Sequence, residues 1–311
     1  MLSFLPHLGS IQIVDCCSGL LLYHTWHPHS LLSICNPATK KWATLPDRFG
    51  RFQNLVLAFD PRHSPHYHVL HFKESQGWTE LEIYSSKTRE WSRCQRLWNH
   101  HTYQILHLPG VYHEGIVYKL AFASAHNLLI GVDVEGEIVR RIDQPNSTDK
   151  ESKRLFLHNQ RVGFSGGYLH HAHHKGKAEL EILVLKDLDG KQWSLKHHAD
   201  IKTMVEMSQG KMALPQLYPF SMGYFDILAL HPDGNVVYLQ VLRKLFAYHL
   251  NNAHLEEVCT FGSGHLQSFL SMRLAFRIAS EMMGFDAILM MIDIMCLHAL
   301  GFVIKVAVEN N

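Results

Sequence analysis

Short apolar runs that alternate with polar residues recur along most of the chain, and turn-forming residues separate them. The stretches 34–46 and 83–94 share one pattern: an apolar strand end, a polar turn with Thr, a basic residue and then Trp. Trp42 and Trp91 lie 49 residues apart, and another 49 residues leads to Arg140, where the pattern persists without Trp. A fourth copy surrounds Trp193 and a fifth occupies 247–258. Each copy predicts a β-hairpin.

Other strand-like runs lie between these hairpins, at 55–61, 66–72, 111–121, 167–174, 180–185 and 226–240. A period of about 50 residues with four short strands is typical of a kelch-type propeller blade. Stacking blades around an axis buries faces that one blade alone leaves exposed. We therefore predict an all-β kelch-type β-propeller of about five to six blades over residues 1–264. Trp42, Trp91 and Trp193 are expected to pack between blades as structural repeat positions.

Residues 265–311 differ in composition from the rest and predict a helical or irregular tail, with nearly continuous apolar sequence over 287–304. Asp293 near its centre costs about 2.5–3.5 kcal/mol in a membrane helix, which roughly cancels the apolar gain. A helix packed on the propeller, a segment created by a shifted exon boundary or gene decay, and a membrane anchor all stay open, and the first two are favoured. A replaced C-terminus predicts a poorly closed ring and a low melting temperature.

The charge balance and the cysteine spacing limit the classes of partner and the cellular compartment that we expect. Lys and Arg number 29 against 28 Asp and Glu, so the basic excess of a nucleic-acid binder is absent. The six cysteines are scattered without a C-x-x-C pair, which favours buried free thiols in an intracellular protein over disulfides or a zinc module. We therefore expect a cytoplasmic or nuclear protein without a nucleic-acid partner, and a membrane is the least favoured partner.

Several blocks resemble the F-box-associated domain of plant F-box proteins, a kelch-type propeller. They include Ile13-Val-Asp-Cys-Cys-Ser-Gly, Cys35-Asn-Pro-Ala-Thr-Lys-Lys-Trp, Leu57-Ala-Phe-Asp-Pro-Arg-His-Ser-Pro and Glu82-Ile-Tyr-Ser-Ser-Lys-Thr-Arg-Glu-Trp-Ser. Later blocks are Gly131-Val-Asp-Val-Glu-Gly-Glu, Trp193-Ser-Leu-Lys-His and Ala229-Leu-His-Pro-Asp-Gly-Asn. The resemblance runs from about Ser3 to about Phe261.

The resemblance implies substrate recognition in an SCF-type ubiquitin ligase, in which an F-box binds a Skp-type adaptor that docks on a cullin. Only twelve residues precede Ile13, too few for an F-box, so we expect adaptor binding only if an F-box lies upstream. The alternatives are a stand-alone or competing partner-binding propeller, or a truncated gene product without a ligase role.

We expect no catalytic residues, no cofactor and no metal. The densest histidine cluster is His170, His171, His173 and His174, where strand geometry would place the first and last on one face and the middle two on the other. No nearby Cys, Asp or Glu in sequence completes a usual ligand set, so these side chains are expected to be half-exposed. The chain has no G-x-S-x-G elbow, and the run from Gly163 to Gly167 predicts a turn.

Propellers commonly bind partners through loops at one end of the central channel. Aromatic residues and histidines in such loop-like stretches are the candidates for binding a protein substrate, because Trp and Tyr often anchor interfaces. These candidates are Trp78, Trp98, His100, His101 and Tyr103.

Overall fold

The computed structural model describes twelve stretches of the chain. They are 4–5, 11–25, 30–46, 54–75, 78–94, 103–123, 126–144, 160–188, 192–209, 224–231, 235–242 and 244–260. Within them the strands form five antiparallel sheets, each built from consecutive strands in chain order.

The first sheet contains β1 (Ile11–Cys17), β2 (Leu20–Thr25), β3 (Leu31–Asn36) and β4 (Lys41–Thr44). The second contains β5 (Leu55–Ala58), β6 (His68–Ser75), β7 (Trp78–Ser85) and β8 (Glu90–Cys94). The third contains β10 (Val111–His113), β11 (Ile116–Ala123), β12 (His126–Asp133) and β13 (Ile138–Asp143), with β9 (Tyr103–Ile105) paired to β11. The fourth contains β14 (Gln160–Ser165), β15 (Tyr168–Lys175), β16 (Glu179–Leu185) and β17 (Trp193–Asp200). The fifth contains β18 (Asp226–Leu230), β19 (Val236–Val241), β20 (Lys244–His249) and β21 (His254–Thr260).

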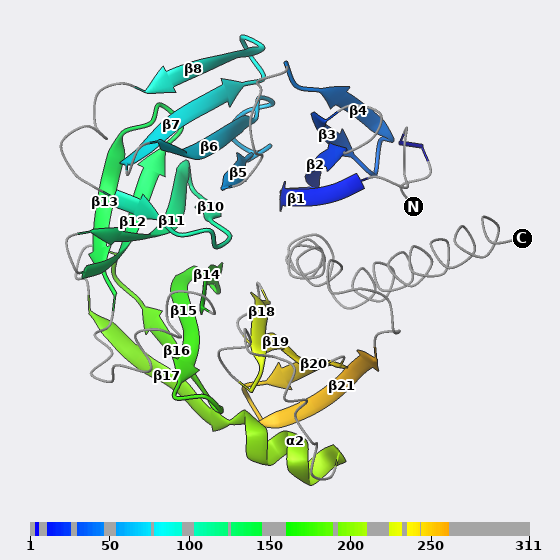
Figure 1. The fold of residues 1–311 in the computed structure, drawn as a ribbon, viewed down its shortest axis with the longest axis vertical. Helices are drawn as coiled ribbons and strands as arrows, with labels where there is room; N and C mark the ends of the chain where they lie inside the picture. The colour runs from blue at the N-terminus through cyan, green and yellow to red at the C-terminus, as the bar shows by residue number, and fades with distance from the viewer. Residues whose placement is uncertain are drawn as a thin grey trace, which may run out of the picture.

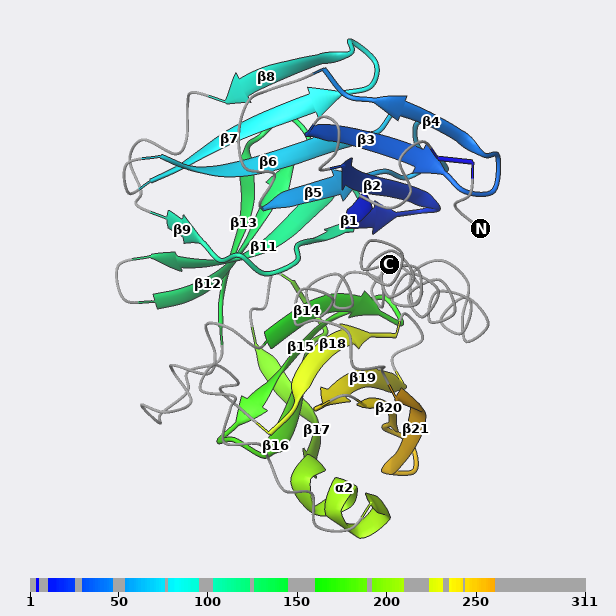
Figure 2. The ribbon, with the colours of Figure 1, turned by 45° about the vertical axis from the view of Figure 1, so that its right-hand side comes forward.

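The five sheets are arranged radially, with β1, β5, β10, β14 and β18 on the inside and β4, β8, β13, β17 and β21 on the outside (Figures 1 and 2). This is a β-propeller, and each sheet is one blade. The fold class predicted from the sequence is confirmed, with five blades in the described part of the chain. The predicted tail at 265–311, and hence the boundary at 264, lies outside the described residues.

All five repeat hairpins correspond to the third and fourth strands of a blade. They are β3–β4, β7–β8, β12–β13, β16–β17 and β20–β21. The 49-residue step in the sequence is therefore the length of one blade. The step widens later in the chain, where a helix follows the fourth blade.

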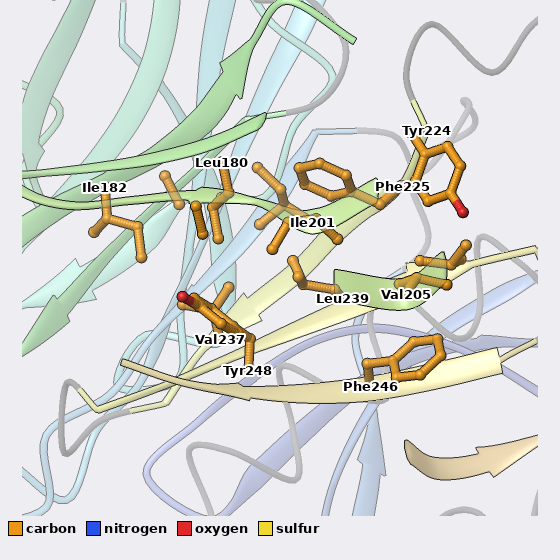
Figure 3. Packing of buried hydrophobic residues seen from close by; sticks show 14 residues of the cluster. Leu180, Ile182, Ile201, Val205, Tyr224, Phe225, Val237, Leu239, Phe246 and Tyr248 are labelled. Carbon is orange, nitrogen blue, oxygen red and sulfur yellow. The ribbon is translucent and has the colours of Figure 1, made fainter. Parts of the chain in front are cut away.

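Apolar side chains fill the space between neighbouring blades, one cluster for each pair from the first to the fifth. The pairs are joined in turn by Leu22 with Leu57, Leu70 with Val117, Leu129 with Leu169, and Leu180 with Leu239. Figure 3 shows the last of these clusters, in which side chains of β16, β19, β20 and the helix meet. Burying one such aliphatic side chain contributes about 1.5–3 kcal/mol, so these clusters stabilise the packing of each blade on the next.

The helix α2 (Ile201–Gln209) follows β17 directly and was not predicted. Asp200 caps its first turn, because one carboxylate oxygen accepts from the Thr203 amide at 3.0 Å and the other from the Thr203 hydroxyl at 2.7 Å. These bonds lower the pKa of Asp200. Ile201 and Val205, one turn apart, pack into the cluster between the fourth and fifth blades.

Candidate recognition surface

The turn between the second and third strand of each blade lies on the same face of the propeller as the connection that leads to the next blade, because consecutive strands are antiparallel. Trp78 begins β7 at such a turn, paired with Ser75. Tyr103 begins β9, which pairs with the end of β11 and lies beside β7. The structure therefore brings the backbone at Trp78 and Tyr103 to one face of the second and third blades.

The other three candidates fall between β8 and β9. Trp98, His100 and His101 lie outside the described residues, as do the side chains of Trp78 and Tyr103. The positions of the flanking strand ends place both ends of this connection on the face that carries Trp78.

The tryptophans of the repeat lie elsewhere, on the outermost strand of their blades. The indole N–H of Trp91 donates to the Pro46 carbonyl at 3.2 Å, and that of Trp193 donates to the Asp143 carbonyl at 2.8 Å. Each acceptor lies at or just after the end of the outermost strand of the preceding blade. Trp42 occupies the same position in the first blade and is 46% exposed.

The four histidines of β15 are buried, so the prediction that they are half-exposed was wrong. The predicted split between faces is confirmed. His174 stacks on Phe225 at 4.0 Å, on the side of the fifth blade, whereas His171 stacks on His173 at 5.0 Å on the opposite side. The sequence does not predict this burial, because a side chain on a blade is buried by the neighbouring blade. A polar residue type gives no sign of that contact.

Burial lowers the pKa of each of these histidines, because the charged imidazolium loses its hydration. The pKa falls to about 4 for His170, His173 and His174, and well below the usual value for His171. The neighbours refine this effect. Lys196, whose ammonium lies 3.1 Å from the His170 ring, opposes protonation further, whereas the carboxylate of Glu181 partly offsets the burial of His173. These rings are neutral at pH 7.

A loop on the face opposite Trp78 is held by one nearly buried carboxylate, that of Asp60. Arg62 donates to both of its oxygens, at 3.0 and 2.8 Å, and the His63 ring nitrogen lies 2.9 Å away. The bonds from Arg62 hold the pKa of Asp60 far below its ordinary range. The Asp-Pro-Arg-His block therefore stabilises the conformation of the loop between β5 and β6.

The described residues contain no group of three or more His, Cys, Asp or Glu side chains placed to hold a metal ion. The cysteines in the same ranges form no disulfide: Cys16, Cys17 and Cys35 are buried, and Cys94 and Cys259 are partly exposed. Burial raises the pKa of Cys35 to about 12, so its thiol is unreactive at pH 7. Across the parts of the chain that are described, no helix has the length and apolarity of a membrane span.

Five radial blades of four or five strands place the protein among the β-propellers. The chain belongs to the F-box associated beta propeller domain family, whose model matches residues 3–215. That match ends before β18, so the fifth blade lies beyond it, although the blocks recognised in the sequence extend to about Phe261. No curated protein matches the chain.

Solved structures with similar folds share little sequence with this chain. A protein from Lactobacillus plantarum is 11% identical, with 81% of this chain and 70% of that chain covered and a TM-score of 0.44. A putative 6-phosphogluconolactonase from Bacteroides uniformis is 11% identical, with 83% and 68% covered and a TM-score of 0.44. An oligogalacturonate lyase from Vibrio parahaemolyticus is 9% identical, with 84% and 82% covered and a TM-score of 0.45. Identities this low assign none of those activities to this chain.

Proposed function

We propose that this propeller recognises a protein substrate for an SCF-type ubiquitin ligase, in the manner of plant F-box proteins. Membership of the F-box associated propeller family carries the proposal. The face with Trp78 and Tyr103 is the binding surface in this proposal, because it collects the connections between blades. An F-box joined to the propeller would supply the contact with a Skp-type adaptor and, through it, with the cullin.

The ligase connection is tested by co-purification with a Skp-type adaptor. We expect no adaptor to co-purify with the 311-residue chain and stoichiometric adaptor to co-purify when an F-box is fused before Met1. Binding of the adaptor by the chain alone would contradict this division of labour. The stand-alone or competing propeller would be favoured instead if the proteins that bind the chain were equally abundant in cells with and without the F-box fusion.

Substrate recognition is tested by cross-linking and quantitative mass spectrometry of proteins captured from plant cytoplasm and nuclei. The double variant Trp78→Ala, Tyr103→Ala should lose the captured proteins, since large aromatic side chains dominate interface energies. Tyr168→Ala is the control, because Tyr168 is an aromatic residue, 46% exposed, that starts a strand at the opposite face. Equal loss in both variants would place recognition elsewhere.

The proposal assigns the chain no catalytic role, cofactor or metal. Two buried charged side chains of the described blades support this, since each makes a contact that joins neighbouring blades. Arg161 donates to the Leu228 carbonyl at 3.1 Å and Asp15 accepts from the Leu57 amide at 2.8 Å. Turnover in a hydrolase and oxidase screen, or stoichiometric metal in protein purified without an affinity tag, would refute it.

A further inference from the structure

The outer strand of the fourth blade, β17, contains a β-bulge at Lys196. Leu195 pairs with Leu183 and His197 pairs with Ile182, so Lys196 is the extra residue between two paired positions. In a regular strand, successive side chains point to opposite faces. A bulge interrupts this alternation and changes the direction of the side chains around it.

Two consecutive side chains of β17 consequently reach groups on the flank that faces the fifth blade. The Lys196 nitrogen Nζ lies 3.1 Å from Nε2 of His170 on β15. His170 is on the same face of β15 as Ala172, which packs in the cluster between the fourth and fifth blades. The ring of His197 lies 2.7 Å from the Tyr248 hydroxyl of the fifth blade.

The orientation of the His170 ring makes it an acceptor toward Lys196. Its Nδ1 lies 3.0 Å from the Tyr168 carbonyl, which can only accept, so Nδ1 carries the proton of the neutral ring. Nε2 therefore accepts from Nζ of Lys196. An amine, a base within hydrogen-bond reach and a third group that orients the base form the arrangement of an activated nucleophile. His170 is 3% exposed whereas Lys196 is exposed, so a reagent from solvent can reach the amine.

Lys196 differs in environment from the lysines of the same two blades that form ion pairs. Nζ of Lys175 lies 2.9 Å from Glu181, and Nζ of Lys244 lies 2.9 Å from Glu257. The hydrogen bond and the charge of Glu181 raise the pKa of Lys175, whereas burial lowers the pKa of Lys196. A lower pKa increases the fraction of neutral amine, which is the nucleophilic form of a lysine.

We propose that Lys196 is a modification site that accepts acyl groups from small-molecule acyl thioesters. The ammonium first releases one proton to solvent, and the amine nitrogen then attacks the thioester carbonyl carbon. As the C–N bond forms, the nitrogen passes a proton to Nε2 of His170, which acts as general base. The C–S bond breaks, and the departing thiolate takes that proton from the imidazolium.

The products are an amide at Lys196 and a free thiol, so no oxidant or further reactant is needed. The pKa of His170 is about 4, which favours transfer of the proton to the thiolate over its retention on the ring. The chain is modified once in this reaction and does not turn over. The site depends neither on the ligase role nor on the surface at Trp78.

The first test compares two lysines within one protein. The full-length chain is incubated with acetyl coenzyme A near pH 7, and mass spectrometry follows acetylation at each lysine. Lys41 is the reference, because it is also exposed on the outermost strand of its blade. We expect Lys196 to react at least about tenfold faster, since a positioned general base contributes a factor of roughly 10² or more. Acetylation of Lys41 at the same rate or faster would overturn the proposal.

A pair of variants tests the role of the base. His170→Phe keeps an aromatic ring but removes the acceptor, so acetylation of Lys196 should fall to about the rate at Lys41. His174→Phe is the matched control, because it makes the same substitution on the same face of β15, where His174 stacks on Phe225. It should leave the rate at Lys196 unchanged. An unaltered rate in His170→Phe, or equal losses in both variants, would refute the role of His170.

The pH dependence of the unaltered protein gives a test that requires no variant to fold. The rate at Lys196 should reach half its maximum at a lower pH than the rate of a solvated lysine model compound, because burial lowers the pKa of Lys196. The titratable groups beside it on this flank are His170 and His197, whose pKa values burial lowers, and Tyr248, whose pKa burial raises. His198 lies on the opposite face. The profile above pH 7 therefore reports the lysine, and a midpoint equal to that of the model compound would overturn the proposal.

Discussion

Trp91 and Trp193 each contact two blades, their own and the preceding one. Each lies on the outermost strand, where its ring packs beside apolar residues of its own blade and its N–H reaches a carbonyl of the preceding blade. Trp42 has the same place in the repeat but precedes every other blade in the chain. The blade before a tryptophan therefore determines what that tryptophan contributes.

Trp193→Phe should destabilise the protein by about 0.5–1.5 kcal/mol, because it keeps the aromatic surface but removes the donor to Asp143. Trp42→Phe is the matched control and should change the free energy of unfolding by less than about 0.5 kcal/mol. Urea unfolding followed by circular dichroism measures both. Equal effects of the two changes would refute a contribution from the hydrogen bond.

Two glycines allow the effect of a left-handed backbone on the free energy of unfolding to be distinguished from the effect of a steric clash. Gly136 has φ +93°, and a Cβ there would lie 2.3 Å from the Cys94 sulfur. Gly167 has φ +80° with open space around it. We expect Gly136→Ala to cost about 2–4 kcal/mol and Gly167→Ala about 1–2 kcal/mol, the ordinary cost of a left-handed Ala. A Gly136→Ala protein as stable as Gly167→Ala would show that Cys94 moves aside without cost.

At the scale of the element, β15 is unusual because its four histidines are buried on both faces. The strand is central in its blade, so His171 bonds Gln160 of β14 at 2.6 Å while His173 lies 3.4 Å from Glu181 of β16. A central strand of this kind normally carries apolar residues. Its stability therefore depends on the rings staying neutral, which links the fourth blade to pH.

Acidification should destabilise the protein between pH 6.5 and about 4. The folded pKa values of His170, His173 and His174, about 4, lie below the unfolded value near 6.5, so below pH 6.5 the unfolded chain binds protons that the folded chain does not. Each histidine contributes a loss of roughly 1.4 kcal/mol per pH unit in this window. Stability from these groups is complete above pH 6.5, and the loss stops growing below about pH 4.

Urea unfolding at several pH values measures this slope. His174→Phe should flatten it by about one proton, since Phe preserves the stacking on Phe225 without titrating. An exposed side chain that does not titrate gives the control: Leu195→Ala, at 59% exposure, should leave the slope in this window unchanged. A slope that is identical in the wild type and His174→Phe would refute the assignment to β15.

For the whole molecule, local features of the fold could be predicted from the sequence and long-range features could not. The hairpins around Trp42, Trp91 and Trp193 were predictable because turn residues and alternation act locally. The capped helix at Asp200 was within reach, since its Asp-x-x-Thr start and the spacing of Ile201 and Val205 are helical. Burial of the β15 histidines and the contacts between blades depend on residues far away in the sequence, at separations such as 42, 65 and 67 for the contacts of Asp15, Lys119 and Arg161, which no local pattern records. The candidate site could not be located from the sequence for the same reason. Its position on one face follows from the pairing of the strand ends at Trp78 and Tyr103.

Ring closure is the property that distinguishes a propeller from a linear array of blades. In a linear array each unit is stabilised by its neighbours, so the two end units open first. If the ring is closed between the first and fifth blades, amides of β2 and β3 in the first blade and of β19 and β20 in the fifth should exchange hydrogen within about tenfold of those of β15 and β16. Native-state hydrogen exchange with mass spectrometry measures all three blades in one experiment. End blades that already exchange a thousandfold faster than the fourth in the wild type would mean that the ring is open.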